Sequence, residues 1–260
     1  MRPFRLAWFA LALLLVLLIA ARPAAAADDA DPLQLPFKLN VGVEQADSPK
    51  ETVNTIKILL FFTLLTLLPG LLLTMTAFTR IIIVLSFVRR ALSLQNLPPN
   101  QVIIGLSLFL TFFIMAPTFS EINTKALQPY LKEEISQKQA LDTALSSLRK
   151  FMFRQTREKD LALFVGLAKL KQPRNHDDVP TYVLAPSFVI SELKTAFQMG
   201  FVIYLPFLVI DMVVSSVLTS MGMFMLPPVM ISVPFKILLF VLVDGWNLVI
   251  KSLATGFLGS

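Results

Sequence analysis

The sequence contains no cysteine and only one histidine among its 260 residues. Without cysteine the chain can form no disulfide bond, no thiolate nucleophile and no cysteine-based metal site. The single histidine, His176, lies in a polar stretch between Asn175 and Asp177. We expect it to be an exposed residue of a loop.

Charged residues are also scarce. They form 15% of the chain, whereas soluble domains have about a quarter. Hydrophobic residues form 55% and the mean hydropathy is +0.71, which predicts an integral membrane protein. The sequence shows no nucleophile paired with a base, no glycine-rich phosphate loop and no cluster of metal ligands. We therefore expect no enzymatic activity, no cofactor and no metal site.

The N-terminus has the pattern of a targeting segment. Arg2 and Arg5 precede an apolar stretch over residues 6–21, and small residues follow as far as Ala27. This order of basic, apolar and small residues is typical of a cleavable secretory signal. We predict a signal peptide over residues 1–27, with an uncleaved anchor as the alternative.

Removal of the signal peptide changes the charge of the chain. It takes away three arginines and no acid, which leaves 20 basic and 17 acidic residues, so the formal net charge falls from +6 to +3. The basic character therefore does not imply nucleic-acid binding.

Residues 28–55 are polar, contain several prolines and lack helical periodicity. They predict a short extracytoplasmic N-terminal segment.

Residues 56–120 predict a first membrane hairpin. An apolar stretch runs from Ile56 to about Leu94 and contains Pro69–Gly70, where we expect a break. A helix needs about 20 residues to cross a bilayer. The stretch is therefore longer than one transmembrane helix needs and slightly too short for two.

The charges of this first half suggest its orientation. Arg80, Arg89 and Arg90 are all basic, and no acid lies near them. By the positive-inside rule residues 80–100 face the cytoplasm. The next apolar run, residues 102–117, then returns outward.

Residues 121–185 are hydrophilic, with eight acids and eleven bases. Leu127, Leu131 and Ile135 keep a four-residue spacing, which predicts amphipathic helices. Because two apolar passages separate this region from the signal peptide, we expect it to be extracytoplasmic. Its apolar faces favour packing between subunits, and contact with a transported substrate is the alternative.

Residues 186–260 form a second apolar half with the same plan as the first. In each half a long apolar segment is broken by a proline, here Pro206, and is followed by Leu-Pro-Pro (residues 97–99 and 226–228). We predict an all-α membrane protein with two helical hairpins of unequal arms and an extracytoplasmic helical insertion. Internal duplication of this kind is common in transport proteins.

The second half also contains ionisable residues at membrane depth: Glu192, Lys194, Asp211, Lys236, Asp244 and Lys251. Such groups are costly and usually face a partner or an aqueous cavity. A proton relay through Glu192 and Asp211 is one interpretation. Structural pairing with lysines of the same or a neighbouring subunit is the other.

Between Asp211 and Lys236 no residue is ionisable, yet residues 221–228 cannot form one regular helix. Gly222 loosens the backbone, and each of the two prolines at 227 and 228 removes an amide donor. Non-helical backbone at membrane depth must lie within protein or line a water-filled cavity. Three methionines crowd this break, and methionine adapts to irregular shapes.

Several segments carry a specific resemblance. Residues 186–201 (PSFVISELKTAFQMGF) and 206–211 (PFLVID) resemble the two signatures of the flagellar biosynthesis protein FliP family. Residues 78–85 (FTRIIIVL), 98–101 (PPNQ) and 110–117 (LTFFIMAP) agree with it in the correct order. The signature residues are Pro186, Phe188, Ser191, Glu192, Leu193, Phe197, Gly200, Phe201, Pro206, Phe207, Leu208 and Asp211.

The resemblance implies a core subunit of the flagellar type III export gate in the bacterial inner membrane, at the flagellar basal body. Members of this family assemble in about five copies with FliQ and FliR. FlhB and FlhA complete the apparatus, and unfolded flagellar subunits pass through it.

In this family a methionine cluster narrows the pore, and Met221, Met223 and Met225 occupy the matching place. The family often has consecutive methionines, whereas this chain interposes Gly222 and Phe224. We therefore count Phe224 with the three methionines as the expected pore gate. The alternative is ordinary packing of these side chains between helices.

Two other functions are weighed against the export gate of the flagellum. The related subunit of a virulence-type injectisome shares the fold and the pore, but such relatives commonly lack a signal peptide. A stand-alone ion channel or transporter would need a binding site at mid-membrane and would function without other subunits. The two signatures argue against it.

Overall fold

A computed structural model describes residues 49–94, 97–170 and 173–259. The predicted signal peptide and most of the predicted N-terminal segment lie outside the described residues. Every regular element within them is a helix, as the all-α prediction requires. The chain divides into two compact units, Met1–Thr55 and Ile56–Ser260, and the helices named below lie in the second, apart from the first turns of α2.

Helix α2 (Pro49–Thr74) continues through Pro69 and Gly70, so the predicted break at these residues is wrong. A proline costs a helix one hydrogen bond, and membrane helices tolerate this loss. The chain bends instead at residues 75–77, where the Thr76 hydroxyl accepts the Phe78 amide at 3.3 Å. Helix α3 (Phe78–Ala91) follows and is too short to span a bilayer.

Helix α4 (Asn100–Ile122) continues without interruption through a π-helical turn, η1 (Asn123–Leu127), into α5 (Gln128–Leu131). The predicted boundary between the first hairpin and the hydrophilic region, at residue 120, therefore falls inside one helical rod.

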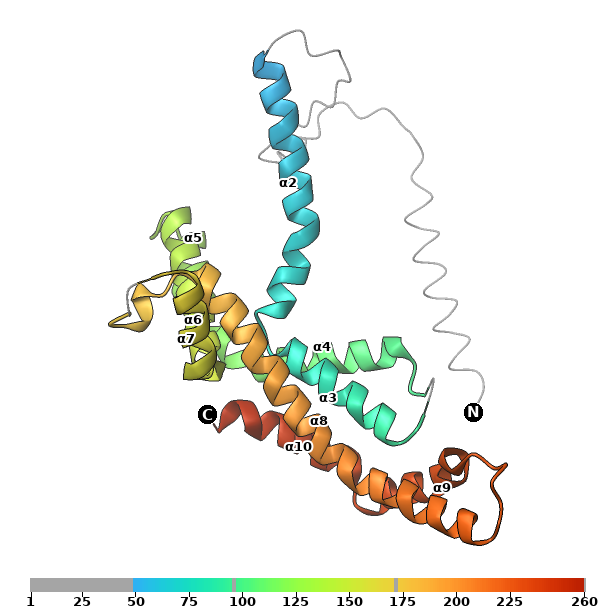
Figure 1. Ribbon diagram of the computed structural model, residues 1–260. Helices are drawn as coiled ribbons and strands as arrows, with labels where there is room; N and C mark the ends of the chain where they lie inside the picture. The colour runs from blue at the N-terminus through green and yellow to red at the C-terminus, as the bar shows by residue number, and fades with distance from the viewer. Residues whose placement is uncertain (1–48, 95–96, 171–172, 260) are drawn as a thin grey trace, which may run out of the picture. The chain divides into compact units, whose positions relative to one another are not determined.

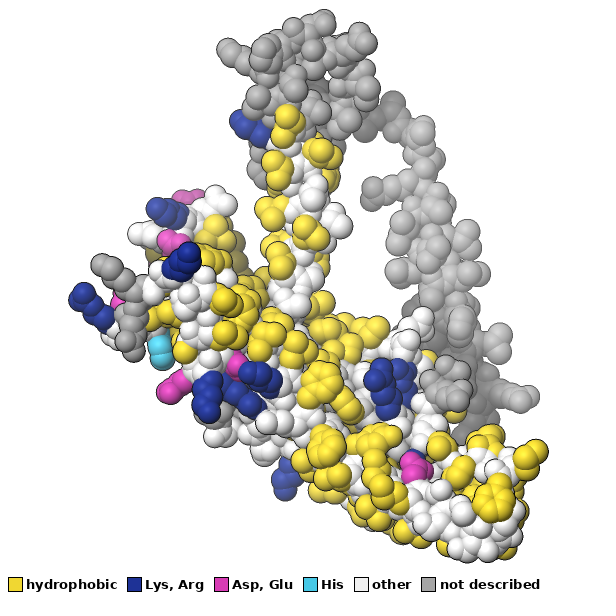
Figure 2. Space-filling view, in the orientation of Figure 1, with side chains coloured by type: hydrophobic (Ala, Val, Ile, Leu, Met, Phe, Trp, Pro, Cys, Tyr) yellow, Lys and Arg dark blue, Asp and Glu magenta, His cyan; other side chains and the backbone are white. Residues whose placement is uncertain are grey.

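The hydrophilic region is helical, as expected, but Leu127, Leu131 and Ile135 do not share one helix, because α5 ends at Leu131 and Ile135 lies in the turn before α6. It contains α6 (Gln137–Gln155), α7 (Glu158–Leu167) and the 3₁₀ turn η2 (His176–Asp178). Ser136 starts α6 with a capping box, since its hydroxyl accepts the Gln139 amide while the Gln139 side chain accepts the Ser136 amide. Figure 2 shows charged side chains gathered over α5, α6 and α7, whereas most of the surface over α8 and α9 is hydrophobic or uncharged.

Helix α8 (Thr181–Ser220) has 40 residues and runs through both Pro186 and Pro206. The break expected at Pro206 is therefore wrong. At 1.5 Å per residue α8 is about 60 Å long, which is about twice the hydrocarbon thickness of a bilayer.

The chain then turns back through α9 (Pro228–Leu242) and α10 (Gly245–Leu258), which meet at a bend of 62°. Figure 1 shows α8 as the longest helix of the unit, with α3 and α7 against its N-terminal half and α9 beside its C-terminal half. The core lies where α3, α6, α8 and α10 meet; its fully buried side chains include Ile81, Met152, Leu184, Phe188 and Leu253.

Three helical segments are long and apolar enough to cross a membrane: Ile56–Thr74, Asn100–Leu131 and Thr181–Ser220. The bent pair of α9 and α10 could provide a fourth. These counts concern the described part of the chain. They agree with a membrane protein of several spans.

Candidate functional site

The stretch that cannot be helical is the turn between α8 and α9. Helix α8 ends at Ser220 and α9 begins at Pro228, which confirms the predicted break. Gly222 has a φ of +73°, in the left-handed region. Its amide donates to the Thr219 carbonyl and the Met223 amide donates to the Leu218 carbonyl, both at 3.0 Å. This is the Schellman ending of a helix, which favours glycine at that position.

The two prolines close the turn from its other side. Pro227 caps α9, and Pro228 occupies its first turn, where the amide of a helix has no partner in any case. Much of the broken backbone is thus satisfied locally. We refer to residues 221–227, for which the sequence predicts a pore gate, as the gate loop.

The side chains of the gate loop are uncovered. The exposed fraction is 96% for Met225, 78% for Phe224, 68% for Met221 and 39% for Met223. No ionisable residue lies in the loop. These four side chains do not belong to the buried core of their own chain.

The signature residues lie elsewhere, on α8, and many of them face the core. The buried ones are Phe188, Ser191, Glu192, Gly200 and Phe207. Pro186, Leu193, Leu208 and Asp211 are half-buried, and Phe197, Phe201 and Pro206 are exposed. The structure therefore does not bring the signatures together with the gate loop; it places them along the helix that carries the loop.

Glu192 is fully buried and forms an ion pair with Arg80 of α3, which is also buried. The Arg80 Nε donates to Glu192 Oε2 at 2.9 Å, and Nη2 donates to Oε1. Such a bidentate contact pairs the two charges and also fixes the position of α3 relative to α8.

The same guanidinium contacts two more helices. Nη2 of Arg80 donates to the Gln155 side chain of α6 at 3.0 Å, and Nη1 donates to the Gly256 carbonyl of α10 at 3.2 Å. The guanidinium carbon also lies 3.7 Å from the centre of the Phe257 ring. We call Arg80, Gln155, Glu192, Gly256 and Phe257 the arginine hub. It joins α3, α6, α8 and α10.

Asp160 fastens α7 to α8. It is buried, accepts a hydrogen bond from the Ser191 hydroxyl at 2.9 Å and forms an ion pair with Lys194. The Lys194 ammonium beside it lowers the pKa of the Asp160 carboxyl, although burial acts in the opposite direction. Arg157 supports the same face by donating to Thr195 and Gln198.

Asp211, the last residue of the second signature, pairs with Lys236 of α9 at 2.6 Å. Ser232 donates to the other carboxylate oxygen, and the Lys236 ammonium also donates to Ser93 at 2.7 Å. Lys236 is fully buried. The lysine pairing considered for Asp211 is therefore observed, whereas Glu192 pairs with an arginine.

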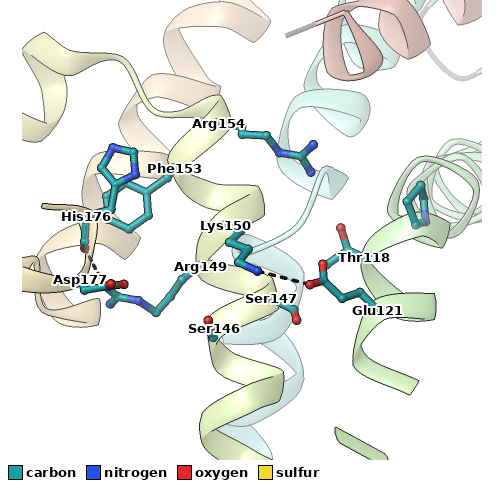
Figure 3. A pocket seen from close by; sticks show the side chains of 11 residues that line it. Thr118, Glu121, Ser146, Ser147, Arg149, Lys150, Phe153, Arg154, His176 and Asp177 are labelled. Atoms are coloured by element: carbon teal, nitrogen blue, oxygen red, sulfur yellow. Dashed lines mark hydrogen bonds and ion pairs between the residues drawn. The ribbon is translucent and has the colours of Figure 1, made fainter. Parts of the chain in front are cut away.

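A polar cavity of about 670 Å³ lies between α4, α6 and η2 (Figure 3). Lys150 reaches Glu121 across it at 3.4 Å, and Arg149 donates to the His176 carbonyl. His176 is exposed, as predicted, and its ring stacks on Phe153 with centroids 4.4 Å apart. The cavity mixes both signs of charge and holds none of the signature residues.

The sequence reasoning missed most of the polar partners. The sequence analysis used Arg80 as a positive charge and as part of segment 78–85, without a partner, and it predicted no role for Gln155, Asp160 or Ser93. A signal was available for Arg80, because a charge inside an apolar run needs a partner. Within the described residues no group of three His, Asp or Glu side chains could hold a metal ion.

The chain is similar to known proteins over most of its length. A model of the FliP family matches residues 61–253. The flagellar biosynthetic protein FliP of Bacillus subtilis is 58% identical over 217 residues, covering 84% of this chain and 98% of that protein. Its counterpart in Treponema pallidum is 48% identical over 86% of this chain and 83% of its own. The Aquifex aeolicus protein is 46% identical over 85% and 91%.

Proposed function

This chain belongs to the FliP family, and from that membership we propose that it is a pore-forming core subunit of the flagellar protein-export gate. Several copies would surround a channel in the bacterial inner membrane through which unfolded flagellar subunits pass. The gate loops of these copies would form its constriction. The relatives named above are flagellar proteins, which favours the flagellum over an injectisome.

The observation that carries this proposal is the uncovered, charge-free gate loop. Met221, Phe224 and Met225 have most of their surface outside the chain's own core. A ring of such side chains makes an apolar constriction, and narrow apolar constrictions block ions by dewetting. Methionine is also flexible enough to adapt to a polypeptide of any sequence.

The apolar surface of the chain supports assembly. Helix α2 from Ile56 to Thr74 is exposed along nearly its whole length. An apolar groove of about 500 Å³ also runs between α8 and α9, with Val213 and Phe235 among its lining residues. Lipid and neighbouring subunits would cover these surfaces. The neighbours are about five copies of the chain with FliQ, FliR, FlhB and FlhA, at the flagellar basal body.

The two carboxylates considered for a proton relay have other roles in this proposal. Glu192 is held by Arg80 and Asp211 by Lys236. In the described part of the chain, every buried side-chain nitrogen and oxygen has a hydrogen-bond partner. A carboxylate held in this way positions its helix, so we assign both residues to anchoring α8.

The absence of native cysteine permits a direct test. Single cysteines are introduced from Ser220 to Pro228, an export substrate is trapped in transit, and cross-linking to it is measured at each position. We expect cross-links at residues 221–225. Cross-links only at flanking positions, with none in the loop, would contradict the assignment of the gate.

A second experiment measures the seal. Replacement of Met221, Met223 and Met225 by alanine should raise ion leakage through the assembled complex, because alanine leaves the constriction wider. Replacement by leucine, which is similar in volume and apolar, is the matched control and should preserve the seal. Unchanged leakage of an intact alanine complex would exclude a sealing role.

A further inference from the structure

The methionines of this chain differ widely in exposure. Met115 and Met152 are fully buried, whereas Met221 and Met225 of the gate loop are 68% and 96% exposed. The loop places three thioethers within five residues. No cysteine is present anywhere in the sequence to react first with an oxidant.

We propose that the gate loop is a site of reversible methionine oxidation, and that its oxidation opens the seal to ions. The substrates of this modification are small two-electron oxidants such as hydrogen peroxide. This inference rests on the proposed function, because it takes the loop to be the constriction of the channel.

The reaction follows from thioether chemistry. A sulfur lone pair attacks one peroxide oxygen, a sulfur–oxygen bond forms and the oxygen–oxygen bond breaks. The leaving hydroxide takes the remaining peroxide proton and becomes water. Sulfur loses two electrons to give the sulfoxide, and the peroxide gains them. Methionine sulfoxide reductases reverse the change.

The consequence follows from the polarity of the product. A sulfoxide is a polar group with a strong hydrogen-bond acceptor, whereas the thioether is apolar. Dewetting requires an apolar wall, so each sulfoxide in the loop favours water in the constriction. Phe224 and Leu226 are not changed by the reaction and would be the large apolar side chains left in the gate loop.

Other exposed methionines provide an internal comparison. Met212 on α8 and Met230 on α9 are 61% and 71% exposed in the single chain. They lie on the mostly apolar surface of these helices, which lipid and subunits would cover. A polar oxidant dissolved in the water of the channel reaches the side chains at the edge of the constriction, whereas lipid shields the outer surface of these helices from it.

The first test maps the reaction. The assembled complex, purified from membranes and reconstituted in liposomes, is treated with hydrogen peroxide, and peptide mass spectrometry measures oxygen addition at each methionine. We expect sulfoxides at Met221 and Met225 before Met212 and Met230, and none at Met115 or Met152. Oxidation of Met212 and Met230 with a fully reduced loop would overturn the proposal.

The second test measures ion leakage before and after peroxide. Leakage should rise severalfold in the native complex, return after treatment with sulfoxide reductases, and stay constant in the variant with leucine at positions 221, 223 and 225. Loop sulfoxides without any rise in leakage would overturn the proposed opening. Failure of the constriction itself is seen separately, because the alanine variant would then seal without any oxidant.

Discussion

Gly222 is the residue at which the chain turns from α8 toward the gate loop. Its φ of +73° is unfavourable for residues with a Cβ, and a Cβ built there would meet no atom within 4 Å. The cost of a substitution therefore comes from the backbone alone. We expect Gly222→Ala to lower the free energy of unfolding by about 1–2 kcal/mol.

The measurement is thermal unfolding of the purified protein in detergent. Gly222→Asn should cost less, because asparagine tolerates the left-handed region better. The matched control is Gly105→Ala in the second turn of α4, where a Cβ also meets nothing within 4 Å. That substitution should be neutral or stabilising, since alanine favours the helix. Equal losses at both positions would contradict the role given to Gly222.

Asp160 predicts a dependence on pH. Its pKa is lowered in the folded protein, mainly by Lys194. A carboxyl group whose pKa is lower in the folded protein stabilises the fold at pH values above its ordinary pKa of about 3.9. This stabilisation is lost as the pH falls through the lower pKa of the folded protein. Asp160→Asn should therefore unfold at a lower temperature than the native protein at neutral pH, and the difference should shrink below about pH 4.

Unfolding temperatures of both proteins across this range of pH would check the prediction. Glu158→Gln is the control, because Glu158 lies exposed on the same helix. Its effect should be small at every pH. A difference for Asp160→Asn that stays constant as the pH falls would show that the carboxylate charge contributes nothing.

These residues also show what the sequence could predict. The break at 221–228 could be located because glycine and proline act through local backbone geometry. The pairing of Arg80 with Glu192 could not, because 112 residues separate them. A partner at that distance depends on how the helices pack, which no local pattern specifies.

At the scale of helices, single prolines within long apolar runs were poor signals of a helix end. Pro69 and Pro206 suggested breaks, yet α2 and α8 continue through them. The helical type and the membrane-length apolar runs could be predicted from composition and periodicity. The true bend lies at residues 75–77, where the Thr76 hydroxyl accepts the Phe78 amide, and threonine there carries no strong sequence signal of a helix end.

The packing of α3 on α8 depends on Gly200. A Cβ at this position would lie 2.5 Å from two ring atoms of Phe87 and 3.0 Å from its Cβ. The helices would have to separate, so we expect Gly200→Ala to destabilise the protein by about 1–3 kcal/mol. Thermal unfolding measures the loss.

A double substitution identifies the cause. With Phe87→Ala present, Gly200→Ala should cost much less, because the ring that it meets is gone. Gly166→Ala is the control, since nothing lies within 4 Å of a Cβ there. If the two substitutions were additive, contact with Phe87 would not be the reason for glycine at position 200.

At the scale of the whole molecule, the arginine hub connects four helices that are distant in sequence. Arg80→Leu would leave the Glu192 carboxylate buried without its cation, which typically costs about 3–5 kcal/mol. Replacing both residues by leucine should recover part of that loss, because the uncompensated charge is removed. The free energies of unfolding of the single and double variants test this.

Arg90→Leu serves as the control for loss of a basic residue from the same helix, because Arg90 is exposed. Its effect should stay within about 0.5 kcal/mol. A double variant less stable than Arg80→Leu alone would show that the buried charge is not what makes the single substitution costly.

The length of α8 has a mechanical consequence. The hub holds the helix at Glu192, and the pair of Asp211 with Lys236 holds it again nine residues before its last residue, Ser220. At 1.5 Å per residue the arm beyond Asp211 is about 14 Å long. A tilt of about 15° at Asp211 would carry the far end through about 3.5 Å over such a length. That distance is comparable to the reach of one methionine side chain, so a rotation at the pair of Asp211 with Lys236 becomes a displacement of a whole side chain at the gate loop.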